Sequence, residues 1–374
     1  MKRPTPTHRL PKLSLGLVSA LLLAACGGPK PSPTPPPDPV TPVAHGRSVE
    51  VNEGTPEAIT LAGEAGPDDA LTFTIVEPPA NGTLSGTPPA LTYVPNPNYL
   101  GADAFTFTVS TGDRTSAPAT IEIEVLNAPF YTITRGGGDA PTSKLYHTNG
   151  KGETALVGDT GHALITIKAD PTNGRLYAAT RVLDVEGGCN SCLVTLDRDT
   201  GAATVVGPFD HDGDPLTEYG AVASIAFTSG GTLYGFSEHS DDLVTIDKAT
   251  GSVTAMESDL SSWAHGMWTD ANDTIWFLNG GGDVYTLNAA TGEATQIHAW
   301  DVLAESYGTD PELEFALRGD RNPLTGSYWG VPPANEADLP AGLHRVEINL
   351  EVARYIDSPS IVVPELAHNL AFAR

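Results

Sequence analysis

The stretch LVTLDRDTGAATVV, from Leu193 to Val206, returns in altered form further along the chain. Its copies are LVTIDKATGSVTAM, from Leu243 to Met256, and VYTLNAATGEATQI, from Val284 to Ile297. In each copy, apolar and β-branched residues alternate on both sides of a D/N-x-x-T-G turn, which is the pattern of two antiparallel strands joined by a short loop. The stretch therefore predicts a repeated β-hairpin.

A further strand pair precedes each hairpin, so every copy contains four strands. The pairs are ITIKADPTNGRLYAAT (165–180), SIAFTSGGTLYGFS (224–237) and GMWTDANDTIWFL (266–278). Four strands that recur about every 40 to 50 residues are typical of the blades of a β-propeller.

The two ends of the repeat region predict the number of blades. Residues 130–134 and 144–160 supply the outer three strands of a first blade, and residues 370–373 match an innermost strand with no followers. We expect the C-terminal strand to complete the first blade, which closes the ring and removes open sheet edges. Hairpins near Thr195, Thr245, Thr286 and Arg345 supply the other blades, so five are predicted.

One acidic or amide residue recurs at the start of each hairpin turn, as Asp197, Asp247 and Asn288. A side-chain oxygen at this position accepts a backbone N–H two residues on, and the glycine that follows tolerates a positive φ. These residues are therefore interpreted as turn formers and not as catalytic groups.

Composition limits the class of protein. The chain has 374 residues, including 39 Gly and 32 Pro, and a formal net charge of −26. The glycine and proline content fits turn-rich β structure in more than one domain. Nucleic acid is excluded as an expected partner, because neutralising phosphates requires clustered Lys and Arg.

Residues 1–25 have the pattern of a targeting segment: basic residues, then an apolar run from Leu13 to Ala25 with a small-residue end. The string Leu23-Ala24-Ala25-Cys26-Gly27 resembles the bacterial lipobox. The resemblance implies cleavage before Cys26 and lipidation of its thiol, with palmitate among the acyl chains. An ordinary secretory signal is the alternative. Because residue 27 is not aspartate, the resemblance implies placement at the outer membrane or cell surface.

Residues 26–43 are predicted to form a proline-rich linker. The run PKPSPTPPPDPVTP, Pro29 to Pro42, cannot form helix or sheet ladders, since proline lacks the backbone donor and restricts φ. An extended spacer between the lipid and the folded domains is expected.

Residues 44–127 contain seven short alternating strands between turn residues, which predict an antiparallel sandwich. The string PPANGTLSGTPPALTYVPNPNYLGADAFTFTVSTGDRTSAPATIEIEV resembles the cadherin-like bacterial immunoglobulin repeats of surface proteins. In those repeats acidic residues hold Ca²⁺, and the matching positions here are Glu53, Asp68, Asp69 and Asp103. Turn formation is the alternative for Asp68 and Asp69, because the following repeat that would share the ion is missing.

Residues 128–374 resemble extracytoplasmic propellers of the NHL-like and quinoprotein-like class, through their L-x-x-I-D-x-x-T-G hairpins. The fold class expected for the whole chain is all-β: an N-terminal cadherin-like or Ig-like β-sandwich followed by a five-bladed β-propeller. The resemblance is informative about fold and poor for function.

Three groups of residues are candidate sites in the propeller. Cys189 and Cys192 are expected to form a local disulfide outside the cytoplasm; a metal site would need two more ligands. Asp210, Asp212 and Asp214 alternate around a glycine and are followed by Glu218, an array of carboxylates that suits Ca²⁺. Pro215 and Ala221 depart from the EF-hand pattern, which has glycine and glutamate at these positions. An exposed acidic turn is the alternative to a calcium site.

The third candidate group is His265 and His368, which each precede an apolar residue of an innermost strand by two positions. That position places both near the mouth of the central channel, where with Glu312 or Glu314 they could bind a small ligand or a transition metal. Histidines bonded to neighbouring loop carbonyls are the alternative. The tripeptide Arg318-Gly319-Asp320 matches an adhesion motif, but an inner-strand turn also explains it.

These features predict a lipid-anchored cell-envelope protein that presents a propeller for ligand or protein binding or adhesion, without catalysis. Its expected partners are the membrane, through the lipid, and an envelope protein or surface glycan. One alternative is a divalent-metal-dependent propeller hydrolase or lyase with its site in the channel, although no H-x-x-E-H or G-x-S-x-G motif occurs. A structural subunit of an envelope assembly is the other.

Overall fold

The structure is a computed structural model, and most of the chain beyond residue 39 can be described. The described residues are 40–373 except 68, 98, 135, 137–140, 182–188, 212–213, 216–221, 238–240, 257–263, 280–282, 300–317, 324, 332–342, 349–352, 358–360 and 362–366. These residues form strands and turns only. Within them there is accordingly no helix of the length and apolarity that crossing a membrane requires.

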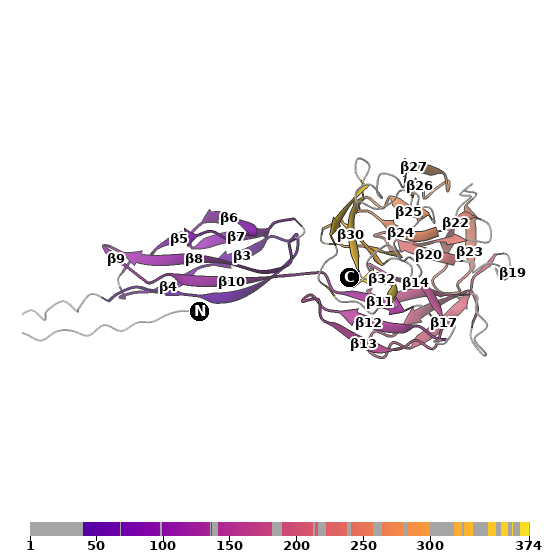
Figure 1. Ribbon diagram of the computed structural model, residues 1–374, viewed down its shortest axis with the longest axis horizontal. Helices are drawn as coiled ribbons and strands as arrows, with labels where there is room; N and C mark the ends of the chain where they lie inside the picture. The colour runs from indigo at the N-terminus through magenta and orange to yellow at the C-terminus, as the bar shows by residue number, and fades with distance from the viewer. Residues whose placement is uncertain are drawn as a thin grey trace, which may run out of the picture. The chain divides into compact units, whose positions relative to one another are not determined.

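The first domain is a sandwich of antiparallel and parallel strand pairs (Figure 1). One sheet has the order β2-β10-β8-β5, with β9 paired to β8, and a second sheet has the order β3-β7-β6. A separate pair joins β1 and β4. The strands are β1 (Val43–His45), β2 (Arg47–Asn52), β3 (Glu57–Thr60), β4 (Ala62–Glu64), β5 (Thr72–Glu77), β6 (Gly82–Thr87), β7 (Ala90–Pro95), β8 (Gly101–Thr111), β9 (Arg114–Thr115) and β10 (Ala119–Leu126).

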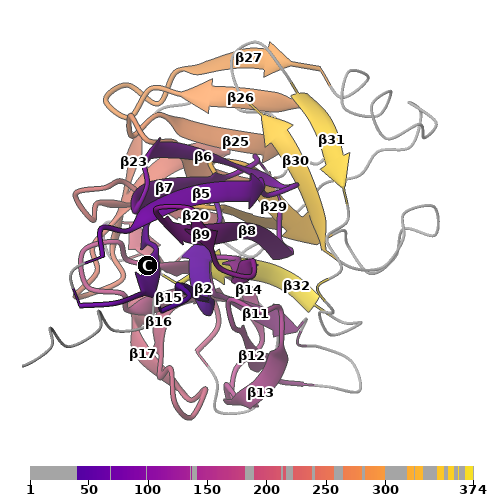
Figure 2. The same ribbon diagram turned by 90° about the vertical axis from the view of Figure 1, so that its left-hand side faces the viewer.

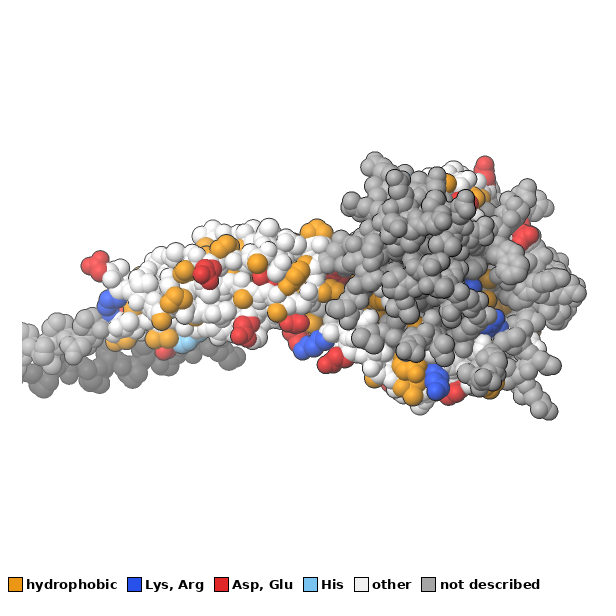
Figure 3. Space-filling model, in the orientation of Figure 1, with side chains coloured by type: hydrophobic (Ala, Val, Ile, Leu, Met, Phe, Trp, Pro, Cys, Tyr) orange, Lys and Arg blue, Asp and Glu red, His pale blue; other side chains and the backbone are white. Residues whose placement is uncertain are grey.

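Alternation along the strands builds the core of the sandwich. In β8 and β10 every second residue is buried, and Phe105, Phe107, Ile121 and Ile123 are among the apolar side chains that point inward. They pack with residues of the other sheet in one cluster. On the face seen in Figure 3, hydrophobic atoms of the described sandwich surface are scattered among uncharged atoms, as on an ordinary solvated sheet.

The second domain consists of five four-stranded antiparallel sheets, numbered here as blades 1 to 5 (Figures 1 and 2). In blades 2 to 5 the chain runs from the innermost strand outwards. Blade 1 contains β32 (Ala367–Phe372), β11 (Phe130–Thr134), β12 (Lys144–Thr148) and β13 (Thr154–Asp159). Blade 2 contains β14 (Leu164–Ala169), β15 (Leu176–Thr180), β16 (Cys192–Leu196) and β17 (Ala203–Pro208).

The other three blades follow in chain order. Blade 3 contains β20 (Val222–Phe227), β21 (Leu233–Ser237), β22 (Asp242–Ile246) and β23 (Val253–Met256). Blade 4 contains β24 (Ala264–Thr269), β25 (Ile275–Asn279), β26 (Val284–Leu287) and β27 (Ala294–His298). Blade 5 contains β28 (Arg318–Arg321), β29 (Tyr328–Val331), β30 (His344–Ile348) and β31 (Ala353–Asp357). A short pair, β18 (Asp210–His211) and β19 (Asp214–Pro215), lies between blades 2 and 3 in the chain.

The C-terminal strand closes the ring as predicted. β32 pairs antiparallel with β11, with Phe372 opposite Phe130. The innermost strands contact one another in the cyclic order β32, β14, β20, β24, β28 and back to β32. The all-β fold class, with an Ig-like sandwich followed by a five-bladed propeller, is therefore confirmed.

The second strand of each of blades 1 to 4 is buried along its whole length. Neighbouring blades cover both faces of these strands, so their sequences are almost continuously apolar and not alternating. IWFLN in β25 is an example, in which Trp276 and Phe277 face opposite neighbours and both are buried.

The repeated hairpin turn has the predicted chemistry. Asp197 Oδ1 accepts hydrogen bonds from the backbone N–H of Asp199 at 3.0 Å and of Thr200 at 2.8 Å, and Gly201 has a φ of 78°. Asp247 and Asn288 accept the equivalent bonds in blades 3 and 4. These residues are turn formers, as interpreted from the sequence.

Candidate functional site

The centre of the propeller is lined by its innermost strands, which end at the same level. Ala169, Phe227, Thr269 and Arg321 pair with the first residues of the second strands in blades 2 to 5. One residue earlier along these strands stand Lys168, Ala226, Trp268 and Asp320. These four residues are among those that line one small cavity, which has room for about one water molecule.

An ion pair crosses the channel at this level. Lys168 Nζ of blade 2 lies 3.0 Å from Asp320 Oδ1 of blade 5 and also donates to the carbonyl oxygen of Gly319. The two side chains are only 4% and 7% exposed. Blades 2 and 5 are not neighbours in the ring, since blade 1 stands between them. The pair therefore spans the centre of the propeller and obstructs it.

Aromatic and backbone groups support this pair. The Trp268 ring lies against Tyr328, with 4.4 Å between centroids, and Asp320 Oδ2 accepts the backbone N–H of Phe372 at 3.2 Å. Burial, followed by the negative charge of Asp320, raises the pKa of Tyr328. Asp320 thus holds together blades 5, 2 and 1 at one point.

The same part of the structure contains the Arg318-Gly319-Asp320 tripeptide. It forms three of the four residues of strand β28, and not a turn. A Cβ on Gly319 would lie 1.8 Å from the carbonyl oxygen of Trp329, so only glycine fits there. Asp320 is buried in its ion pair and cannot be presented to a receptor from this position.

A bulge interrupts the innermost strand at the same place in four blades. The register shifts between Leu164 and Thr166, Val222 and Ser224, Ala264 and Gly266, and Ala367 and Asn369. The bulged residues are Ile165, Ala223, His265 and His368. Bulges commonly redirect side chains at the rims of closed β structures.

The two candidate histidines therefore occupy equivalent backbone positions in blades 4 and 1. Their side chains lie outside the described part of the structure, as do Glu312 and Glu314. Among the described residues, no group of three or more His, Cys, Asp or Glu is placed to hold a metal ion. Ligand binding by His265 and His368 stays a prediction.

Between the bulge and the ion pair lies a level of small polar residues. Thr166, Ser224 and Asn369 occupy it on β14, β20 and β32, and each is fully or almost fully buried. Within the part of the chain that the structure describes, their side-chain oxygens have no hydrogen-bond partner. Sequence reasoning did not single out these residues, because a lone Thr or Ser in a strand carries no motif.

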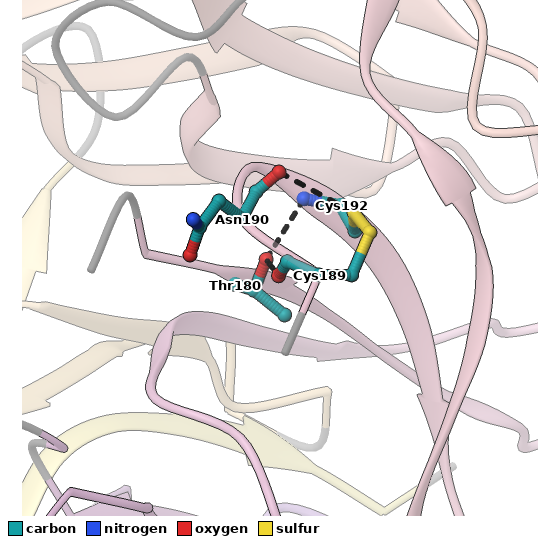
Figure 4. Close-up of a disulfide and its surroundings, with 4 residues drawn as sticks. All are labelled: Thr180, Cys189, Asn190 and Cys192. Atoms are coloured by element: carbon teal, nitrogen blue, oxygen red, sulfur yellow. Dashed lines mark hydrogen bonds between the residues drawn. A yellow bond between two sulfur atoms is a disulfide. The ribbon is translucent and has the colours of Figure 1, made fainter. Parts of the chain in front are cut away.

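The cysteine pair forms the predicted local disulfide (Figure 4). The Cα atoms of Cys189 and Cys192 are 5.8 Å apart. Thr180 Oγ1 donates to the carbonyl oxygen of Cys189 and accepts the N–H of Cys192, both at 2.8 Å. The disulfide and Thr180 together hold the loop against strand β15, which is a structural role.

The acidic segment folds in part as a hairpin. Asp210 is opposite Pro215 and His211 is opposite Asp214 in the pair β18–β19. Asp212 and Glu218 lie outside the described residues. The calcium site predicted for Asp210, Asp212, Asp214 and Glu218 is therefore not tested.

In the sandwich, the Asp103 carboxylate accepts hydrogen bonds from other residues of the same domain. Its carboxylate accepts the N–H groups of Ala80 and Asn81, each at 3.0 Å, and the Tyr93 hydroxyl at 2.8 Å. Burial, and then the bond to Asp103, raise the pKa of Tyr93. Asp69 accepts from Gly66 N–H and pairs with Arg114, which agrees with a turn role.

Comparison with known proteins identifies one part of the chain. Residues 38–124 match the model of the bacterial Ig domain. This is the sandwich described above. No curated relative of the chain is found.

Solved structures give low-similarity matches. Virginiamycin B lyase from Staphylococcus aureus with quinupristin is 13% identical, with 76% of this chain and 88% of that chain covered and a TM-score of 0.35. YCF48 bound to a D1 peptide is 11% identical, with 77% and 85% covered and a TM-score of 0.32. An endo-fucoidan hydrolase of glycoside hydrolase family 107 is 24% identical, with a TM-score of 0.20. The match covers 23% of this chain and 14% of the hydrolase.

Proposed function

We propose that the chain is a lipid-anchored cell-envelope protein whose propeller binds a ligand or protein partner, or mediates adhesion, without catalysis. The order of segments supports this: a targeting segment that ends just before Cys26, a proline-rich spacer, a bacterial Ig domain and a propeller. Each of the first three has a physical use in holding the last away from a membrane.

The observation that carries the non-catalytic part of the proposal is the ion pair between Lys168 and Asp320. It uses charged side chains at the centre of the ring to join non-adjacent blades, and Asp320 also accepts from the backbone of the C-terminal strand. A buried carboxylate that is held by a cation and an N–H is occupied in supporting the fold. Recognition is therefore expected at the channel mouth or at the faces of the propeller.

Anchoring is tested by replacing the thiol. We expect Cys26→Ser to abolish labelling by a palmitate analogue, because the thiol that would carry the acyl chain is gone. Ser32→Ala, in the same linker, is the matched control and should be labelled like the wild type. Unchanged labelling of Cys26→Ser would contradict the anchor.

Binding is tested by affinity capture from the native envelope in mild detergent, with the full chain as bait. Capture of a surface glycan or of a substoichiometric envelope protein supports a binding or adhesion role. A stoichiometric partner that persists through purification would replace it with a structural subunit of an assembly. Turnover of a hydrolase or lyase substrate panel, with added divalent ions, would replace it with a metal-dependent propeller enzyme.

A further inference from the structure

The second residue of the hairpin turn is a cation in blades 2 and 3, and in both it contacts the preceding blade. Arg198 Nε donates a hydrogen bond to the Tyr131 hydroxyl of blade 1 at 3.1 Å, and its guanidinium carbon lies 5.1 Å from the centre of that ring. In blade 3, Lys248 Nζ instead lies 2.7 Å from Asp170 Oδ2 of blade 2. The same turn position thus contacts a neutral phenol in one blade and a carboxylate in the next.

A histidine stands beside the phenol in blade 1. His147, on β12, is directly opposite Tyr131, on β11, and their ring centroids are 4.7 Å apart. Tyr131 is buried, whereas His147 and Arg198 are half-buried. We call these three residues the Tyr131 cluster. It holds an imidazole, which gains a charge in mild acid, next to a guanidinium that is always charged.

The backbone of the same turn is also held on blade 1. Ala203 N–H, at the start of β17, donates at 3.1 Å to the carbonyl oxygen of Thr160, in the connection between blades 1 and 2. Gly158, on β13, lies so close to the turn that a Cβ would be 1.9 Å from Thr200 O. The Ala203 amide hydrogen therefore becomes open to exchange with solvent when the turn separates from blade 1.

We propose that the Tyr131 cluster is an acid-sensitive latch between blades 1 and 2. At neutral pH the uncharged imidazole stacks with Tyr131, and Arg198 stays bound to the phenol. In mild acid the imidazolium brings a second positive charge beside Arg198, and repulsion between the two cations weakens the contact of the turn with blade 1. The C-terminal strand completes blade 1, so this contact adjoins the closure of the ring.

The direction of the effect follows from the pKa of the imidazole. Burial, followed by the positive charge of Arg198, lowers the pKa of His147 from its ordinary value of 6.5. The folded chain therefore binds this proton less readily than the unfolded chain does. Neutral His147 contributes stability at pH values above the unfolded pKa, and the contribution is lost as the pH falls through the folded pKa. The latch accordingly responds in the acidic range below pH 6.5.

The surroundings of His147 offer no described carboxylate that would offset its charge. On the flanking strands, β11 presents the phenol of Tyr131 and β13 presents an alanine methyl group. Arg198 faces the imidazole from blade 2. The two acids beside it in the turn, Asp197 and Asp199, are exposed, and Asp197 accepts N–H groups of its own turn. The charge that His147 meets is therefore positive.

The test is hydrogen exchange of the full chain in detergent, followed by mass spectrometry. It is carried out at about pH 7.5 and about pH 5, on either side of the ordinary imidazole pKa. Observed rates are divided into the intrinsic rates at each pH, so that protection factors are compared. The peptide 197–206, which contains the Ala203 amide, should lose protection about fivefold in acid, as expected for two close unit charges in a well-solvated site. Unchanged protection there would overturn the proposal.

The equivalent turn of blade 3 is the internal reference. Burial raises the pKa of Asp170, but the bonds from Lys248 and Thr172 more than offset it, so the pKa lies below 3.8. This carboxylate stays ionised at about pH 5 and keeps its hold on Lys248, so residues 247–256 should keep their protection. An equal loss in both turns would show a general loosening in acid and would overturn the assignment to the Tyr131 cluster.

Variants identify the groups that respond. His147→Phe keeps a ring against Tyr131 but takes up no proton, so the peptide 197–206 should stay protected in acid. Arg198→Met removes the opposing charge and should give equal protection at both pH values. His298→Phe, which removes a half-buried imidazole on β27 of blade 4, is the matched control and should show the loss seen in the wild type. Persistence of the loss in His147→Phe or Arg198→Met, or its disappearance in His298→Phe, would overturn the proposal.

Discussion

Asp170 shows how single residues join neighbouring blades. It lies in the turn after β14, is fully buried, and accepts hydrogen bonds from Thr172 N–H at 2.9 Å and from Lys248 Nζ of blade 3 at 2.7 Å. Burial alone raises the pKa of Asp170, but the bonds from Lys248 and Thr172 more than offset it, so the pKa lies below its ordinary value of 3.8. The ionised form is therefore the one that the fold stabilises.

This pKa shift predicts a pH dependence. Because the pKa is lower in the folded state, ionised Asp170 stabilises the fold at every pH above the unfolded value, and the contribution is lost as the pH falls through the folded value. We expect Asp170→Asn to lower the free energy of unfolding by about 1–3 kcal/mol at neutral pH. The deficit should shrink below about pH 3.8, as measured by urea unfolding followed by circular dichroism.

An exposed carboxylate of the same blade provides the control. Asp199→Asn, in the β16–β17 turn, should change the free energy of unfolding by less than about 0.5 kcal/mol at either pH. A deficit in Asp170→Asn that is equally large in acid and at neutral pH would show that the carboxylate is not the stabilising group.

At this scale the sequence predicted what is local. Asp197 could be assigned as a turn former because its partners are two and three residues away. Asp170 and Lys248 are 78 residues apart, and each resembles an ordinary exposed turn residue in the sequence. Only the packing of blade 3 against blade 2 brings them together.

The repeated hairpin has a second role at the scale of the element: its turn packs on the preceding blade. Gly207, on the outer strand β17, lies so close to the turn of blade 3 that a Cβ would be 1.8 Å from Thr250 O. Gly158, on β13, stands in the same relation to Thr200 O of blade 2, at 1.9 Å. Glycine is required at both positions for steric reasons, because the turn backbone occupies the place of a side chain.

We expect Gly207→Ala to separate blades 2 and 3 slightly and to lower the free energy of unfolding by about 1–3 kcal/mol, as other overpacking substitutions do. Gly230→Ala is the matched control, because a Cβ there would meet nothing within 4 Å. It should be neutral within about 0.5 kcal/mol. Thermal unfolding of the two variants beside the wild type measures the difference, and equal midpoints would refute the role of the turn.

The elements themselves were predictable because each blade repeats one pattern. The alternation in LVTLDRDTGAATVV and its copies, together with the strand pair that precedes each copy, predicted four strands per blade, and the structure has them. The aligned bulges and the glycines at positions 158 and 207 were not predicted from the sequence. The two glycines are required by contact with the turn of the neighbouring blade, which the pattern of their own strand does not reveal. A sequence repeat therefore predicts the strands within a blade but not the packing between blades.

At the scale of the whole molecule, the ring depends on its closure. The sequence indicated this from its ends, since β11 lacked an inner partner and the last strand lacked an outer one. It could not indicate that Lys168 and Asp320, 152 positions apart along the chain, would meet at the centre. Asp320 also accepts from Phe372 N–H on the closing strand, so one carboxylate joins the ion pair to the closure.

The pair should therefore behave as one unit in a double-mutant cycle. Asp320→Asn leaves the Lys168 ammonium buried without its counter-charge, and Lys168→Met leaves the carboxylate in the same state, so each should lower the free energy of unfolding by about 3–5 kcal/mol. The double variant removes both charges, while the amide that replaces the carboxylate keeps an oxygen for Phe372 N–H. It should lose less than the sum of the single variants, because no isolated charge remains. Urea unfolding of the four proteins gives the coupling energy. Additive losses in the double variant would show that the two charges do not depend on each other.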